Sequence, residues 1–150
     1  MTEDRKALLE HYRKMREEFL AAIEGLSDAH MTEPSIDGWS VTDHLAHVAL
    51  WDDFRAAEVT RISAGHDSAW RMDPAHEAAF SPIAYELRRA MSPAQAKWEL
   101  EHSRATLLAA ISGATERGLD ASLYGEAGLV SSHEAEHAGW IRRWRGERRI

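Results

Sequence analysis

The feature that most constrains the fold of this chain is an apolar repeat at steps of three and four residues, which is the spacing of one helix face. In residues 3–26 it runs through Leu8, Tyr12, Met15, Phe19, Ile23 and Leu26. No stretch alternates β-branched or aromatic residues with polar ones between turn residues, so strands are not expected. The pattern predicts an all-α protein whose helices each bury one apolar stripe.

Capping residues mark where two of the helices begin. Ser40, with Asp43 three residues later, has the pattern of a capping box. Ser92 is a candidate cap, and Pro93 would occupy the first helical position. Glycines follow the expected helix ends. We therefore expect four main helices, over residues 3–26, 41–64, 93–112 and 129–145.

The connection over residues 66–91 has a weaker pattern than the rest of the chain. A short helix is expected after Asp73-Pro74 and another over residues 82–91. The other connections are short or of modest length, which favours an antiparallel arrangement. With no internal repeat or long linker, the 150 residues are expected to form one domain, residues 1–150. That domain should be an antiparallel four-helix bundle with extra short helices in this connection.

Composition and charge exclude several classes of function. The net charge of -7 does not favour nucleic acid. No apolar run approaches the roughly 18 residues of a membrane span. The polar N-terminal sequence lacks the apolar region of a secretory signal, so we expect a cytoplasmic protein. With no cysteine, any metal must be held by histidines and carboxylates. The Arg-rich segment 142–150 is expected to offset a helix dipole, with an anion contact as the alternative.

Residues 133–137 read H-E-A-E-H and match the H-E-x-x-H pattern of zinc peptidases. On a helix, His133 and His137 differ by about 40° around the axis and about 6 Å along it, so both can bind one ion. A peptidase also needs a third ligand and a glutamate that activates water. Downstream the only carboxylate is Glu147, about 15 Å away along the helix. Glu134 would flank the two histidines, so a peptidase is disfavoured.

Two further histidines, His44 and His47, lie on or beside the apolar side of the helix expected over residues 41–64. A buried neutral imidazole needs a partner for its polar nitrogens. A metal ion would meet that need, and so would a backbone carbonyl. The remaining histidines are expected on the solvated surface: His11, His30, His66, His76 and His102.

Two segments carry a resemblance to a known family. G-W-S-V-T-D-H-L-A-H-V-A-L-W-D-D-F at residues 38–54 and H-E-A-E-H-A-G-W-I-R-R-W-R at residues 133–145 resemble the DinB/YfiT-like superfamily. Its members are four-helix bundles that bind a divalent metal through one histidine of the second helix and two of the last. The resemblance implies His47, His133 and His137 as ligands. His44 matches a variable position and is expected in the core or beside the site.

Three imidazoles with an open coordination position are typical of catalytic rather than structural metal sites. Nitrogen ligands suit Zn, Ni, Fe or Cu, and spacing does not choose among them. The resemblance implies low-molecular-weight thiols, such as bacillithiol or mycothiol, as cosubstrates of some relatives and hydrolysis by others. We therefore expect a metal-dependent enzyme acting on a small molecule, thiol S-transferase-like or hydrolase-like. The alternative is non-catalytic metal or small-ligand binding by a stress-related dimeric module, and a homodimer is expected in either case.

Other residues are candidates for the rest of such a site. Asp52, Glu58 and Glu134 are candidate general bases or partners of the ligand histidines, with a solvated surface position as the alternative for each. Trp51, one turn after the histidine at 47, and His44 are expected to line a substrate pocket. A plain core position is the alternative for the tryptophan.

Overall fold

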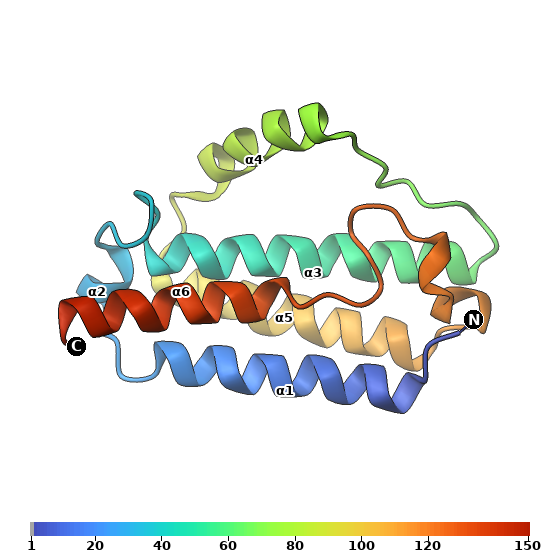
Figure 1. Cartoon of the computed structure of the whole chain (residues 1–150), viewed down its shortest axis with the longest axis horizontal. Helices are drawn as coiled ribbons and strands as arrows, with labels where there is room; N and C mark the ends of the chain where they lie inside the picture. Colours follow the sequence, from blue (N-terminus) through green and yellow to red (C-terminus); the bar gives the residue numbers. More distant parts are fainter. Residues whose placement is uncertain (1) are drawn as a thin grey trace.

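The computed structural model describes residues 2–150 and is built from helices packed side by side (Figure 1). Four long helices form a bundle: α1 (Arg5–Ile23), α3 (Val41–Ser63), α5 (Pro93–Ser112) and α6 (His133–Arg148). Within residues 2–150 the only strand-like pairing is an isolated bridge between Ile36 and Trp39. The prediction of an all-α four-helix bundle is confirmed.

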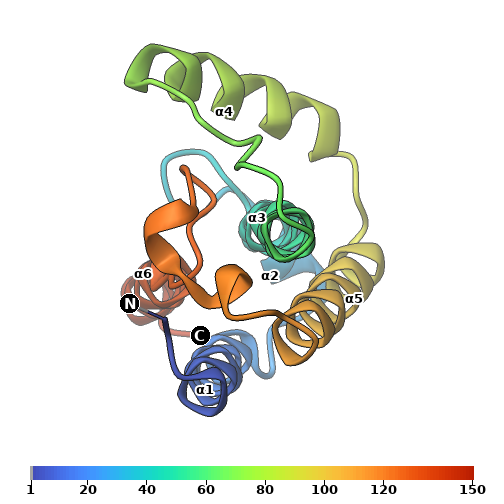
Figure 2. The ribbon, with the colours of Figure 1, turned by 90° about the vertical axis from the view of Figure 1, so that its right-hand side faces the viewer.

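The direction of the helices follows from one long crossover connection. Figure 1 shows α1 and α6 running one way and α3 and α5 the other, and Figure 2 shows the four bundle helices end-on around a shared core. The chain leaves the end of α3 and passes along the outside as α4 (Pro74–Arg88). It then re-enters the bundle at the opposite end, which makes α3 and α5 parallel neighbours. Bundles with one crossover of this kind are a known variant of the four-helix arrangement.

The expected caps of α3 and α5 are present. The Ser40 hydroxyl accepts from the Asp43 amide at 3.1 Å, and the Asp43 carboxylate accepts from the Ser40 amide at 2.9 Å. The Ser92 hydroxyl accepts from the Gln95 amide at 3.1 Å, and Gly113 is the C-cap of α5. These local hydrogen bonds satisfy amides that the first helical turn leaves free.

The long connection contains one helix where two were expected. α4 starts at Pro74 behind the cap Asp73 and continues through Pro82 to Arg88. Pro82 lacks the N–H that would bond to the carbonyl of Ala78. Both residues are exposed, so water can serve that carbonyl, and no residue of α4 is buried. Pro82 therefore lies inside a helix outside the bundle rather than at the start of a second one.

Further differences from expectation are a short additional helix and the bounds of α1 and α6. α1 ends at Ile23, and the short helix α2 (Asp28–Thr32) forms behind the cap Ser27, in a stretch where no helix was expected. α6 begins at His133 rather than at residue 129, because residues 129–132 are non-helical and the carbonyl of Leu129 accepts the Tyr12 hydroxyl at 2.5 Å. Two 3₁₀ turns, Arg117–Leu119 and Ala121–Leu123, complete the connection from α5.

The basic C-terminal segment binds the end of another helix. Arg145 donates to the carbonyls of Ala22 and Glu24 at 2.9 and 2.8 Å, and Arg142 donates to Glu18 at 2.8 Å. The carbonyls of Ala22 and Glu24 lie at the end of α1, where cations are favourable, and that of Glu18 lies about one turn earlier. α6 itself runs through Gly146, where its end was expected, to Arg148, and the left-handed Arg149 that follows, with a φ of 58°, is its C-cap.

The core consists of two apolar clusters with a layer of buried charges between them. One cluster includes Phe19, Leu45 and Ile141, and the other includes Tyr12 and Leu107. Five buried charged residues, contributed by all four bundle helices, form this layer: Arg16, Asp52, Arg55, Arg104 and Glu134. No helix in the described part of the chain combines the length and apolar character that a membrane crossing requires.

Candidate metal centre

Three histidines from two neighbouring helices converge at one point. His47 comes from α3, and His133 and His137 come from the first two turns of α6. One ring nitrogen of each lies within 4.8 Å of the others, and the Nε2 atoms of His133 and His137 are 3.0 Å apart. Ligand nitrogens of a tetrahedral zinc ion lie about 3.3 Å apart. The pair on α6 is close to this spacing, and all three nitrogens lie near enough to be candidate ligands of one ion.

Burial keeps these imidazoles neutral, which is the form that binds a metal. Desolvation, with a contribution from neighbouring histidines, lowers the pKa of His47 to about 3 and that of His137 to about 2. Desolvation also lowers the pKa of His133. A cluster of neutral imidazoles with lone pairs directed at one point has the chemistry of a metal site.

A fourth histidine stands directly behind the three. The Nδ1 atoms of His44 and His137 are 2.7 Å apart, so the two rings share a hydrogen bond. His44 is only 2% exposed, and desolvation lowers its pKa to about 4. Its Nε2 is buried without a hydrogen-bond partner among the described residues. The structure thus places His44 in the core against a candidate ligand rather than on the wall of a pocket.

The open side of the three-histidine cluster faces a groove of about 340 Å³. His47, Trp51 and Arg55 of α3 form one wall, and α4 and the segment 126–131 contribute others. Trp51 is half-buried and packs against the rings of Phe54 and Phe80. It lines the groove beside His47, where the sequence pattern placed it.

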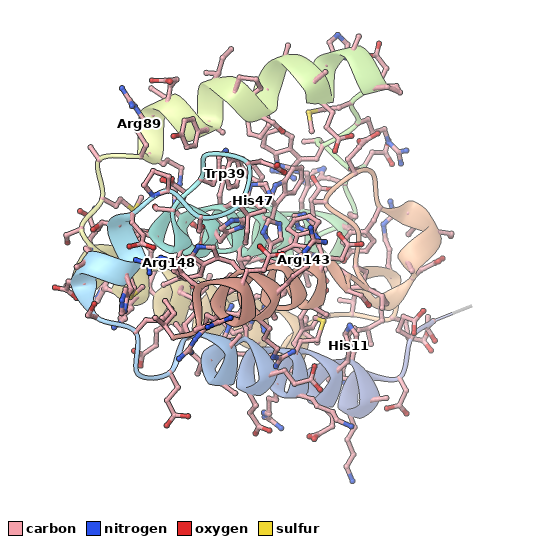
Figure 3. The ribbon with its side chains drawn as sticks, turned by 60° about the vertical axis from the view of Figure 1, so that its left-hand side comes forward. His11, Trp39, His47, Arg89, Arg143 and Arg148 are labelled. Atoms are coloured by element: carbon pink, nitrogen blue, oxygen red, sulfur yellow. The ribbon has the colours of Figure 1, made fainter. Side chains whose placement is uncertain are left out.

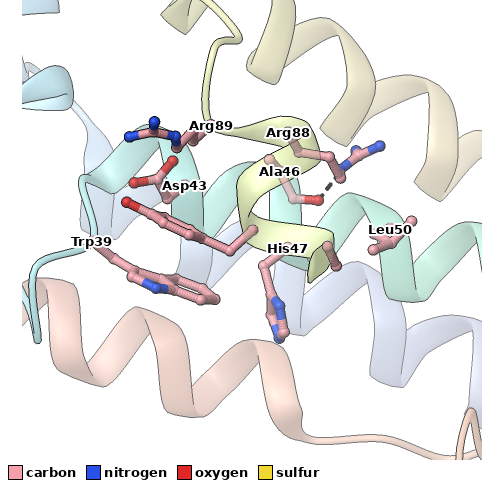
Figure 4. A pocket seen from close by; sticks show the side chains of 9 residues that line it. Trp39, Asp43, Ala46, His47, Leu50, Arg88 and Arg89 are labelled. Carbon is pink, nitrogen blue, oxygen red and sulfur yellow. Dashed lines mark hydrogen bonds between the residues drawn. The ribbon is translucent and has the colours of Figure 1, made fainter. Parts of the chain in front are cut away.

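A second aromatic wall lies on the α4 side of the site. Trp39 stacks on Tyr85 of α4 with ring centroids 5.4 Å apart, and it lies 5.3 Å from both His44 and His47. Figure 3 shows Trp39 and His47 between α4 and α6. Trp39, His47 and residues of α4 line a small cavity of about 20 Å³, and Arg88 at its edge donates to the Ala46 carbonyl at 3.3 Å (Figure 4). Trp39, the residue before the cap of α3, therefore contacts the histidine cluster.

The acidic candidates do not contact the histidines. Both oxygens of Glu134 accept from arginines, Oε1 from Arg16 at 2.5 Å and Oε2 from Arg104 at 2.6 Å. Asp52 accepts from the same two arginines, at 3.1 and 3.0 Å, and from Arg55 at 3.3 Å. Their carboxylates are engaged in the charged layer. The glutamate that made residues 133–137 look proteolytic is therefore turned away from the site.

Glu58 lies further along α3 and is fully buried. Its carboxylate pairs with Arg61 and accepts from the Ala69 amide at 2.9 Å, so it ties the start of the long connection to α3. A solvated surface position was the alternative for Asp52, Glu58 and Glu134, and it is wrong for all three.

The arginines of the charged layer were missed by sequence analysis. A usable signal was present, because Arg16 interrupts the apolar stripe of the first helix between Met15 and Phe19. Arg104 lies in the same way between Leu100 and Leu107. A cation inside an apolar stripe needs a buried acidic partner, and the structure supplies Asp52 to both arginines.

The protein is therefore a helical bundle that carries a candidate metal centre of three histidines beside an open groove. The family model of the DinB superfamily matches residues 11–141. The chain belongs to the DinB superfamily. No curated protein sequence matches it.

Two solved structures share the fold. One is a histidine-to-alanine mutant of the mycothiol-dependent maleylpyruvate isomerase, with a TM-score of 0.68 and 15% identity. The alignment covers 97% of this chain and 59% of the chain of the mutant isomerase. The other, titled as the same isomerase, has a TM-score of 0.67 and 16% identity over 93% of this chain and 58% of its own. This chain thus spans less than two thirds of either neighbour, and the likeness concerns the fold.

Proposed function

We propose that this protein binds a divalent metal ion through His47, His133 and His137 and acts as a metal-dependent enzyme on a small molecule. The observation that carries the proposal is the convergence of three neutral ring nitrogens within 4.8 Å of one another at the edge of a groove. Three protein ligands leave a coordination position for a reactant, as catalytic sites require. When bound, the ion would lower the pKa of a coordinated thiol or water.

The residues around the cluster suit this role. The groove offers access from one side, while the indoles of Trp39 and Trp51 wall off the histidines on either side of His47. Exclusion of water by these apolar walls strengthens electrostatic interactions at the reacting group. The hydroxyl groups of Ser81 and Ser131 line the groove and offer hydrogen bonds to a bound molecule.

A low-molecular-weight thiol is the proposed cosubstrate in a thiol S-transferase-like reaction. The support is the shared fold with a solved isomerase described as mycothiol-dependent and the open position beside neutral histidines. Hydrolysis is the second candidate, since the same position suits an activated water. An assay with and without added thiol distinguishes the two reactions, because only the thiol-dependent reaction requires thiol for turnover.

Metal analysis tests the proposal directly. Protein purified without chelator, and protein loaded with zinc and then desalted, would be analysed by elemental mass spectrometry. We expect close to one ion per chain in the natural protein, and loss of that ion in His47→Ala and His133→Ala. His66→Ala, which changes an exposed loop histidine, is the matched control and should retain the ion. A natural protein that stays metal-free after loading would refute the proposal.

A further inference from the structure

The positive and negative charges of the charged layer beside the histidine cluster do not cancel. Every member is at most 9% exposed. Its side chains are three guanidinium groups and two carboxylates, which leaves one surplus positive charge: Arg16, Arg55, Arg104, Asp52 and Glu134. An uncompensated buried charge is costly, so its location within the layer matters.

Two of the three arginines are fully engaged. Arg16 donates to Glu134, to Asp52 and, at 2.8 Å, to the Leu100 carbonyl. Arg104 donates to the same two carboxylates and, at 2.7 Å, to the Tyr12 carbonyl. Each of their guanidinium nitrogens therefore has an acceptor. The surplus charge does not reside on these residues.

Arg55 is bound differently. Its Nε donates to the carbonyls of Ala127 and Gly128 at 2.9 and 3.0 Å, and its Nη1 makes a long contact of 3.3 Å with Asp52. Its Nη2 has no acceptor among residues 2–150. Arg55 is 4% exposed, and it forms part of the same groove wall as His47. Arg55 thus offers the groove that leads to the histidines a donor nitrogen that has no acceptor within the described part of the protein.

An anion in the groove would satisfy that donor and offset the surplus charge. The need is greater with a metal ion bound, because like charges repel strongly where water is scarce. The planar guanidinium of arginine matches the geometry of a carboxylate better than an ammonium does. Glu77 and Glu126 also line the groove, but both are exposed, where water screens their charge. Their negative charges disfavour a second anionic group close to them, but they do not prevent an anionic group from binding against Arg55.

We infer that the small molecule bound in this groove carries one carboxylate-type anionic group, which Arg55 recognises while another atom of the molecule occupies the open metal position. The inference rests on the proposed function. It names the chemical class of the reactant and gives Arg55 the role of a specificity-determining residue. A neutral amide of the same length would lose the charge-assisted part of the contact with Arg55 and leave the metal contact unchanged.

Matched thiols on the cobalt-loaded full-length protein test this inference. The probes are mercaptocarboxylates of two to four carbons, each compared with its amide, and binding is followed by the thiolate-to-cobalt absorption band. We expect the best carboxylate to bind about 10- to 100-fold tighter than its amide, the range for a hydrogen bond to a charged group. Arg55→Gln should reduce that ratio to about 1 while the cobalt spectrum without thiol is retained. Arg143→Gln, an exposed change on α6, should leave the ratio as in the natural protein.

Arg55→Lys covers the case in which the glutamine variant does not fold. It keeps the charge and lacks the planar fork, so the preference should fall without disappearing. Equal binding of carboxylate and amide by the natural protein overturns the inference, and so does a preference unchanged in both Arg55 variants. Failure of cobalt to bind at all overturns the proposed function and this inference with it, whereas cobalt binding without a carboxylate preference overturns only the inference.

Discussion

The hydrogen bond between His44 and His137 offers a quantitative test of the candidate metal centre. If the Nε2 of His137 binds an ion, its proton must lie on Nδ1, which then donates to the Nδ1 of His44 over 2.7 Å. His44 must in turn carry its own proton on Nε2. The substitution His44→Leu removes the acceptor, so nothing holds the ring of His137 in the tautomer and orientation that a metal requires.

The size of the effect follows from the role of such partners. Loss of the hydrogen bond to a metal-binding histidine weakens metal affinity about 10- to 100-fold, which is about 1.4–2.7 kcal/mol. The buried Nδ1–H of His137 would also lose its acceptor, which costs about 1–3 kcal/mol of stability in the metal-free protein. Both the metal affinity and the free energy of unfolding should therefore fall.

Competition against a chromophoric zinc chelator measures the affinity, and urea unfolding of the metal-free protein measures the stability. His44→Gln is the matched variant, because its side-chain oxygen can accept from the Nδ1–H of His137. It should restore most of the affinity lost in His44→Leu. Zinc binding by His44→Leu as tight as in the natural protein would show the argument to be wrong, as would equal losses in the leucine and glutamine variants.

Three further predictions concern pH, charge and capping. Burial lowers the pKa values of His44, His47 and His137, so below about pH 6.5 the unfolded chain binds more protons than the folded protein. As the pH is lowered from 6.5 to about 4, the free energy of unfolding of the metal-free protein should therefore fall by about 1.4 kcal/mol per pH unit for each such histidine. Urea unfolding at pH 7 and pH 5 measures this, and His47→Ala should show a shallower dependence; an equal slope would contradict the assignment. Glu134→Gln leaves two buried arginines short of a partner and should cost about 3–5 kcal/mol, whereas removal of the exposed Arg143 should cost less than about 1 kcal/mol. A normal unfolding midpoint for Glu134→Gln, with loss of activity alone, would instead support a catalytic glutamate. Ser40→Ala removes the cap of α3 and should cost about 1 kcal/mol in the same assay, and no change would mean that the cap is replaced by water.

The helices themselves could be predicted from the sequence because their causes are local. The apolar stripe of α1 and the capping box at Ser40 act within a few residues of one another. The bounds that were missed depend on distant contacts. The non-helical segment before α6 is held by the hydrogen bond from the Tyr12 hydroxyl to the Leu129 carbonyl. α4 stays continuous through Pro82 because that helix lies outside the bundle.

The histidine pair His133 and His137 was determined by sequence alone, because a spacing of four on one helix places two side chains on one face whatever surrounds it. That His47 meets this pair was implied by family resemblance, and only the packing of α3 against α6 brings the three nitrogens together. Tertiary structure also decided which polar residues serve the site. It buried the carboxylate of Glu134 among arginines and placed His44 behind the ligands, because hydrogen-bond partners from different helices are set by how the helices pack and not by spacing within one of them.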